Sequence, residues 1–115
     1  MIEKNSLTKD IKKVVVKVKI LKIIESRKVY SYALIKEISD NKRIGSFFGS
    51  KKEIRDEVYN TIKILEKSGY ITLTRRLTTG RRTNYYTITR EGRMVLKNAR
   101  SIFASSMKEI SRMFE

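Results

Sequence analysis

Residues 50–89, SKKEIRDEVYNTIKILEKSGYITLTRRLTTGRRTNYYTIT, decide the fold because they predict a helix followed by a β-hairpin. The stretch opens with Ser50-Lys51-Lys52-Glu53, a capping box whose serine and glutamate satisfy backbone N–H groups at a helix start. Gly69 lies where a left-handed residue commonly ends a helix. The buried face of the predicted helix repeats at helical spacing and comprises Ile54, Val58, Thr61, Ile62 and Leu65.

Two short segments after this helix, 70–75 and 83–89, alternate apolar and polar residues as strands do. The chain between them contains Thr78-Thr79-Gly80, which favours a tight turn. Four arginines flank the turn, at positions Arg75, Arg76, Arg81 and Arg82. The pattern predicts a β-hairpin with a basic tip.

A final helix is predicted from Thr89, a suitable N-cap, to about Met113. Apolar and small residues recur along it at spacings typical of a heptad seam: Leu96, Ala99, Phe103, Ser106, Ile110 and Met113. The seam is short for an independent coiled coil. We therefore expect this helix to dock on a partner.

The N-terminal part of the chain predicts a loose arm over residues 1–8 and a helix from Lys9 to about Ser26. Residues 16–20 alternate like a strand, but the apolar stretch is long for one strand and contains no turn signal. As a helix it is apolar on two sides. One strip comprises Ile11, Val14, Val15, Val18 and Leu21, and we expect it to serve the subunit's own core. The second strip comprises Val16, Ile20, Ile23 and Ile24, and we expect it to meet a second subunit.

A second helix is predicted from Ser31, a plausible N-cap, to about Ser39-Asp40-Asn41. Its buried face comprises Leu34, Ile35 and Ile38. A polar stretch follows that contains Phe47 and Phe48, which we expect to fill the core beneath the loop.

Composition points to a polyanionic partner. The 115 residues include 27 Lys plus Arg against 12 Asp plus Glu, a net charge of +15, which attracts nucleic acid. No apolar run is long enough to span a membrane, and no signal-peptide pattern opens the chain, so we expect no membrane partner. Cysteine and histidine are absent, which removes disulfides, thiol and imidazole catalysts and the usual zinc sites. We expect no enzyme, no metal and no cofactor.

The order of elements predicts a mostly α-helical α+β fold, a winged helix-turn-helix of three helices and a two-stranded wing, with a long C-terminal dimerisation helix. One domain is expected, with the winged-helix core over residues 9–89 and the last helix over 90–114. In such folds the third helix enters the major groove of DNA. Lys51 and Lys52 lie at the positive end of that helix, where a cation costs roughly 0.3–1 kcal/mol and a phosphate would reverse the effect. The candidate DNA-binding residues are Lys51, Lys52, Arg55, Tyr59, Asn60, Lys63, Arg75, Arg76, Arg81, Arg82 and Asn84.

Three segments, 30–38, 58–71 and 80–93, resemble the PadR-like transcriptional regulators, and the likeness extends over about residues 20–96. The resemblance implies that Tyr59 contacts DNA from the third helix and that Arg81 contacts it from the wing. It also implies that the first and last helices build a dimer. Residues expected at that interface are Val16, Ile20, Ile23, Ile24, Leu96, Ala99, Phe103, Ile110 and Met113.

The chain departs from the family pattern at Asn60, where a proline is common, and in the loop 39–50, which is longer than usual. Both departures affect how the third helix is presented, so base contacts are not carried over. Other small archaeal winged-helix regulators share the same plan and stay as alternatives.

Together these features predict a homodimeric, sequence-specific regulator of double-stranded DNA, acting as a repressor in the cytoplasm at the nucleoid. Two half-sites about 10 base pairs apart would match its two recognition helices. A non-specific chromatin protein and an RNA-binding module are the alternatives. The sequence identifies no small-molecule effector and no operator.

Overall fold

The computed structural model describes the backbone of residues 2–43, 50–78 and 81–115, and the side chains of residues 7–43, 50–75 and 84–115. The helices are α1 (Ile2–Ser26), α2 (Ser31–Ser39), α4 (Lys51–Lys67) and α5 (Arg90–Met113). The strands are β1 (Val29–Tyr30), β2 (Ile71–Thr78) and β3 (Arg81–Ile88). The predicted loop phenylalanines, Phe47 and Phe48, lie outside the described residues.

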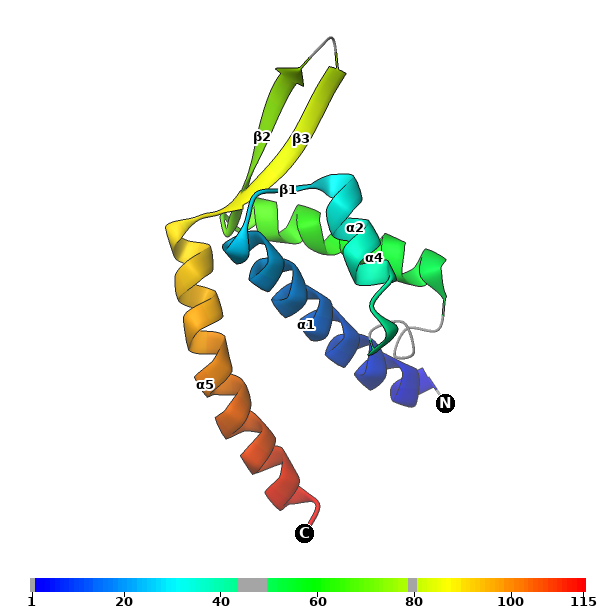
Figure 1. Ribbon diagram of the computed structural model, residues 1–115. Helices are drawn as coiled ribbons and strands as arrows, with labels where there is room; N and C mark the ends of the chain where they lie inside the picture. The colour runs from blue at the N-terminus through cyan, green and yellow to red at the C-terminus, as the bar shows by residue number, and fades with distance from the viewer. Residues whose placement is uncertain (1, 44–49, 79–80) are drawn as a thin grey trace.

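The elements form a winged helix with an added C-terminal helix, as predicted. Helices α1, α2 and α4 pack together, and the β2–β3 hairpin projects from them as a wing (Figure 1). Helix α5 leaves the base of the hairpin and diverges from α1 toward its C-terminal end (Figure 1). The antiparallel sheet has the order β1-β3-β2, with Thr78 of β2 opposite Arg81 of β3 at the tip. Strand β1, which the sequence did not predict, pairs Val29 with Tyr86 and Tyr30 with Tyr85.

The core lies where the three helices meet the base of the sheet. The predicted inner faces of α2 and α4 are buried, including Leu34, Ile38 and Val58 at 0 % exposure. Val29 of β1, Ile71 of β2 and Tyr86 of β3 close the sheet side of the same cluster. The periodicity of residues 54–65 therefore identified the inner face of α4 correctly.

The two apolar strips of α1 face the opposite way from the prediction. Val16, Ile20, Ile23 and Ile24 are at most 5 % exposed and belong to the subunit's own core, so they are no uncovered surface for a partner. On the other strip, Ile11 (51 %), Val14 (41 %) and Val15 (36 %) are exposed, and only Leu21 is buried. Helical spacing defines both strips but does not show which one meets α4.

Helix α1 also begins earlier than expected, because residues 2–8 are helical and not a loose arm. No glycine or proline interrupts the segment, and Leu7 continues the spacing of the exposed strip toward the N-terminus.

Capping interactions fix the ends of α4 and α5. The Oγ of Ser50 accepts the backbone N–H of Glu53 at 3.2 Å, as the capping box predicts. Gly69 has φ 81°, and its N–H and that of Tyr70 donate to the carbonyls of Glu66 and Leu65, which makes a Schellman ending. The Oγ1 of Thr89 accepts the N–H of Gly92 at 3.0 Å and donates to the carbonyl of Gly69 at 2.7 Å. One hydroxyl therefore joins the end of α4 to the start of α5.

The predicted cap at Ser31 is wrong. Tyr30 is the N-cap of α2 and makes no side-chain capping bond, whereas Ser31 is the first helical residue. The Oγ of Ser31 instead donates to the hydroxyl of Tyr86 at 3.4 Å. The pairing of β1 with β3 holds Tyr30 in extended backbone and so sets the start of α2.

Candidate nucleic-acid interface

The outward side of α4 carries the polar residues singled out in the sequence. Lys52, Asp56, Tyr59 and Lys63 follow one another at positions i, i+4, i+7 and i+11, which places them on one face of the helix. Arg55 and Asn60 flank this face. All six side chains are exposed, and Lys51 beside them is exposed in the first turn. The structure thus gathers every α4 residue of the predicted site on a single accessible surface.

Residue types on this face suit contact with DNA. Lysine and arginine donate to phosphate oxygens and to the guanine edge, while asparagine can pair with adenine through two hydrogen bonds. Tyr59 is 48 % exposed and adds a hydroxyl and a ring face. The face can therefore combine backbone positioning with base reading.

Carboxylates also lie on α4, and they are answered by lysines of α1. A groove of about 610 Å³ runs between the two helices, with Glu53, Asp56 and Glu57 of α4 on one side. Its other side is lined by Lys9, Lys12 and Lys13. This arrangement offsets the negative charge that α4 would otherwise present to a polyanion.

The wing residues are only partly described. Arg75 and Asn84 lie opposite each other in the β2–β3 register, and both side chains are exposed. The backbones of Arg76, Arg81 and Arg82 belong to the hairpin, and their side chains lie outside the described set. At the base of the wing the Nζ of Lys28 lies 5.4 Å from the centre of the Tyr85 ring, which also packs edge-on against Tyr30 at 5.9 Å.

Two residues of α2 belong to this surface and were missed by sequence reasoning. Tyr32 and Lys36 share a groove with Lys51, Arg55 and Tyr59 of α4. Their spacing of four on a helix whose buried face is already known was the available signal.

The described residues contain no group of three or more histidine, cysteine, aspartate or glutamate side chains placed to hold a metal ion. Within the same residues, no helix combines the length and the apolar character needed to cross a membrane.

The comparison with family models matches residues 20–98, more than half of the chain, to the transcriptional regulator PadR-like family. The chain belongs to the PadR-like family. The resemblance seen in the three sequence segments is thereby confirmed, and its extent agrees closely with the matched region. Members of this family are transcriptional regulators and not enzymes, so this PadR-like protein is a transcriptional regulator.

Solved structures share the PadR-like fold. A PadR family regulator from Eggerthella lenta has a TM-score of 0.70 at 18 % identity, over 96 % of this chain and 91 % of that one. A transcriptional regulator from Clostridium thermocellum has a TM-score of 0.68 at 25 % identity, over 92 % of this chain and 99 % of that one. Bacillus subtilis PadR in complex with operator DNA has a TM-score of 0.58 at 22 % identity over 73 % of this chain, which spans 45 % of that chain. The comparison with curated proteins gives no match.

Proposed function

We propose that this PadR-like regulator binds operator DNA as a homodimer and represses transcription by occupying the operator, in the cytoplasm at the nucleoid. The observation that carries the proposal is the exposed face of α4, on which Lys52, Tyr59 and Lys63 lie in line. The net charge of +15 and the Bacillus subtilis PadR–operator complex support it. Helix α4 would enter the major groove, and the wing would contact the adjacent backbone through Arg75, Arg76, Arg81, Arg82 and Asn84.

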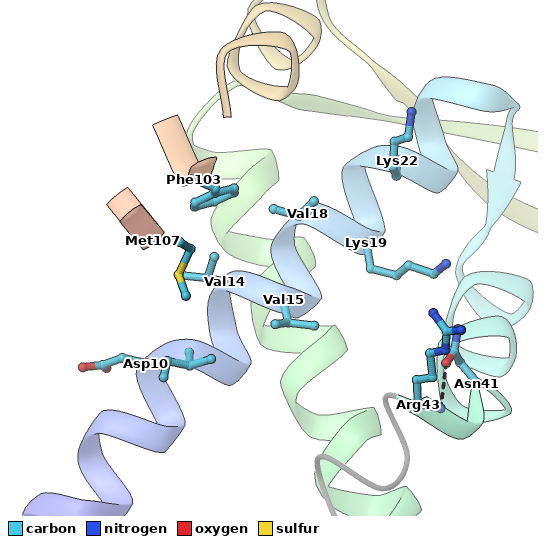
Figure 2. Close-up of a pocket in the computed structure, with 11 residues that line it drawn as sticks. Asp10, Val14, Val15, Val18, Lys19, Lys22, Asn41, Arg43, Phe103 and Met107 are labelled. Atoms are coloured by element: carbon cyan, nitrogen blue, oxygen red, sulfur yellow. Dashed lines mark hydrogen bonds between the residues drawn. The ribbon is translucent and has the colours of Figure 1, made fainter. Parts of the chain in front are cut away.

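The dimer is proposed from the groove between α1 and α5, called here the α1–α5 groove. It has a volume of about 680 Å³, and its apolar lining includes Ile11, Val14, Val15, Val18, Phe103 and Met107. Figure 2 shows Phe103 and Met107 of α5 beside Val14 and Val18 of α1. Lys19, Lys22, Asn41 and Arg43 line its polar side.

A contiguous apolar surface of this kind is unusual on a soluble monomer. Ile110 (44 % exposed) and Met113 (78 % exposed) extend it along α5. A two-fold dimer, in which each α5 fills the α1–α5 groove of the other subunit, would cover it. The interface residues then become the exposed strip of α1 together with Phe103, Met107, Ile110 and Met113. Leu96 packs against the subunit's own core and Ala99 is half-buried, so both contribute less to the interface than first predicted.

Single substitutions on α4 test whether this helix reads bases. Asn60→Ala is expected to relax preference at one base-pair position by about 1–3 kcal/mol, whereas Lys52→Ala should weaken binding to all duplexes about equally. Both side chains are exposed, so the fold should be retained. The measurement is the affinity of each variant for a selected duplex and for its single-position substitutions. If Asn60→Ala and Tyr59→Ala both shift affinity equally on every sequence, α4 only positions the protein, and the chromatin alternative would be favoured.

A further inference from the structure

Tyr32, Lys36, Asp40, Lys51, Arg55 and Tyr59 line a groove of about 480 Å³ between α2 and α4, called here the α2–α4 groove. Lys36 comes from the last turn of α2, while Lys51 and Arg55 lie one turn apart at the start of α4. Three cations from two helices therefore border one groove, against one carboxylate. In the described part of the chain, none of the three forms an ion pair.

From this arrangement we infer that the α2–α4 groove holds a phosphate of the DNA backbone. The inference rests on the proposed function, and it assigns Tyr32 and Lys36 of α2 to the DNA-binding surface. Like charges gathered around a groove repel one another, and a bound anion removes that repulsion. Arginine can bind a phosphate through two parallel N–H groups, while a lysine supplies a point charge and a tyrosine hydroxyl a further donor.

The position of the groove beside α4 fits this ligand. Lys51, Arg55 and Tyr59 succeed one another at i, i+4 and i+8, and so form one flank of α4 next to the face of Lys52 and Lys63. A helix lying in the major groove has a phosphate backbone along each side. The backbone on the Lys51 flank would run between α4 and α2, which cross each other beside the wing (Figure 1).

Exposure of the α2 residues makes the inference testable. Tyr32 is 77 % exposed and Lys36 is exposed, so neither supports the core. Lys36→Gln and the double variant Tyr32→Phe/Lys36→Gln should melt close to the wild type. An effect on DNA binding can then be assigned to the surface itself.

The test measures the affinity of wild type and variants for a selected duplex and a scrambled duplex over a series of salt concentrations. Lys36→Gln is expected to weaken binding to both duplexes by about fivefold to tenfold near 0.1 M salt, and to reduce the log–log salt slope by about one. Lys108→Gln removes the same charge from an exposed position on the far half of α5, and serves as the matched control. Because the control changes net charge equally, it should lower affinity much less and keep the wild-type slope.

Two results separate the possible failures. If the wild type binds duplex DNA but Lys36→Gln keeps the wild-type slope and affinity, the α2–α4 groove holds no phosphate, and only this inference is overturned. If the wild type itself binds no duplex, the proposed function fails. A loss equal to that of Lys108→Gln also overturns the inference, because it reflects net charge alone.

Discussion

Phe103→Asp is expected to convert the protein from a dimer to a monomer at micromolar concentration and to weaken binding to a two-half-site operator at least about a hundredfold. Phe103 is 38 % exposed and lines the α1–α5 groove beside Val14 and Val18 (Figure 2). Burying each such apolar side chain contributes roughly 1.5–3 kcal/mol, whereas an unpaired carboxylate there would be strongly unfavourable. Sedimentation gives the mass, and titration of the operator gives the affinity.

A matched control is Ser101→Asp, which places the same charge on the opposite side of α5 at an exposed residue. It should keep the dimer mass. Val14→Asp, on the facing wall of the groove, should reproduce the effect of Phe103→Asp without opening the core, because Val14 is 41 % exposed. A dimer that survives both Phe103→Asp and Val14→Asp would contradict the proposed interface.

Gly92→Ala is expected to lower the free energy of unfolding by about 3 kcal/mol, and the melting temperature by roughly 10 °C. A Cβ at this position would lie 2.2 Å from the carbonyl oxygen of Tyr70 and 2.8 Å from the Cγ1 of Ile88. The Tyr70 carbonyl already accepts the N–H of Thr89 at 3.0 Å. Backbone at the junction of α4, β3 and α5 would therefore have to move. Thermal unfolding followed by circular dichroism measures the change.

Gly69→Asn is the control for this prediction, because it tests a glycine that is needed for a different reason. Gly69 has φ 81°, but nothing lies within 4 Å of a Cβ placed there. Asparagine tolerates the left-handed region, so its loss should stay below about 1 kcal/mol. Gly92→Ala melting at the wild-type temperature would contradict the close approach of α5 to Tyr70.

Local signals in the sequence were enough to predict α4, the wing and α5. Ser50 and Thr89 cap their helices through side-chain oxygens, and such caps depend on neighbours three residues away. Gly69 ends α4 for an equally local reason, its positive φ. The family model then confirmed the resemblance that these segments carry.

Features that depend on tertiary contact could not be predicted in the same way. Both faces of α1 repeat at helical spacing, and only the packing of α4 and the sheet buries Val16 and Ile20 in place of Val14 and Val15. Strand β1 is two residues long, too short for any alternation to show. Its pairing with β3 also displaced the predicted cap at Ser31.

The predicted site was sound on α4 and incomplete on α2. Residues of one helix can be placed on a common face from spacing alone, so Lys52, Tyr59 and Lys63 were assigned together. The approach of Tyr32 and Lys36 to Arg55 depends on how α2 crosses α4, which spacing does not reveal.

The central claim is that the exposed face of α4 makes this PadR-like protein a sequence-specific reader of duplex DNA. Selection of bound fragments from random duplex DNA, followed by affinity measurements at physiological salt on the selected and scrambled sequences, tests it most directly. The account predicts at least about a thousandfold preference for the selected duplex, in which two half-sites lie about 10 base pairs apart. Equal affinity for selected and scrambled duplexes, or stronger competition by RNA than by duplex DNA, would contradict it.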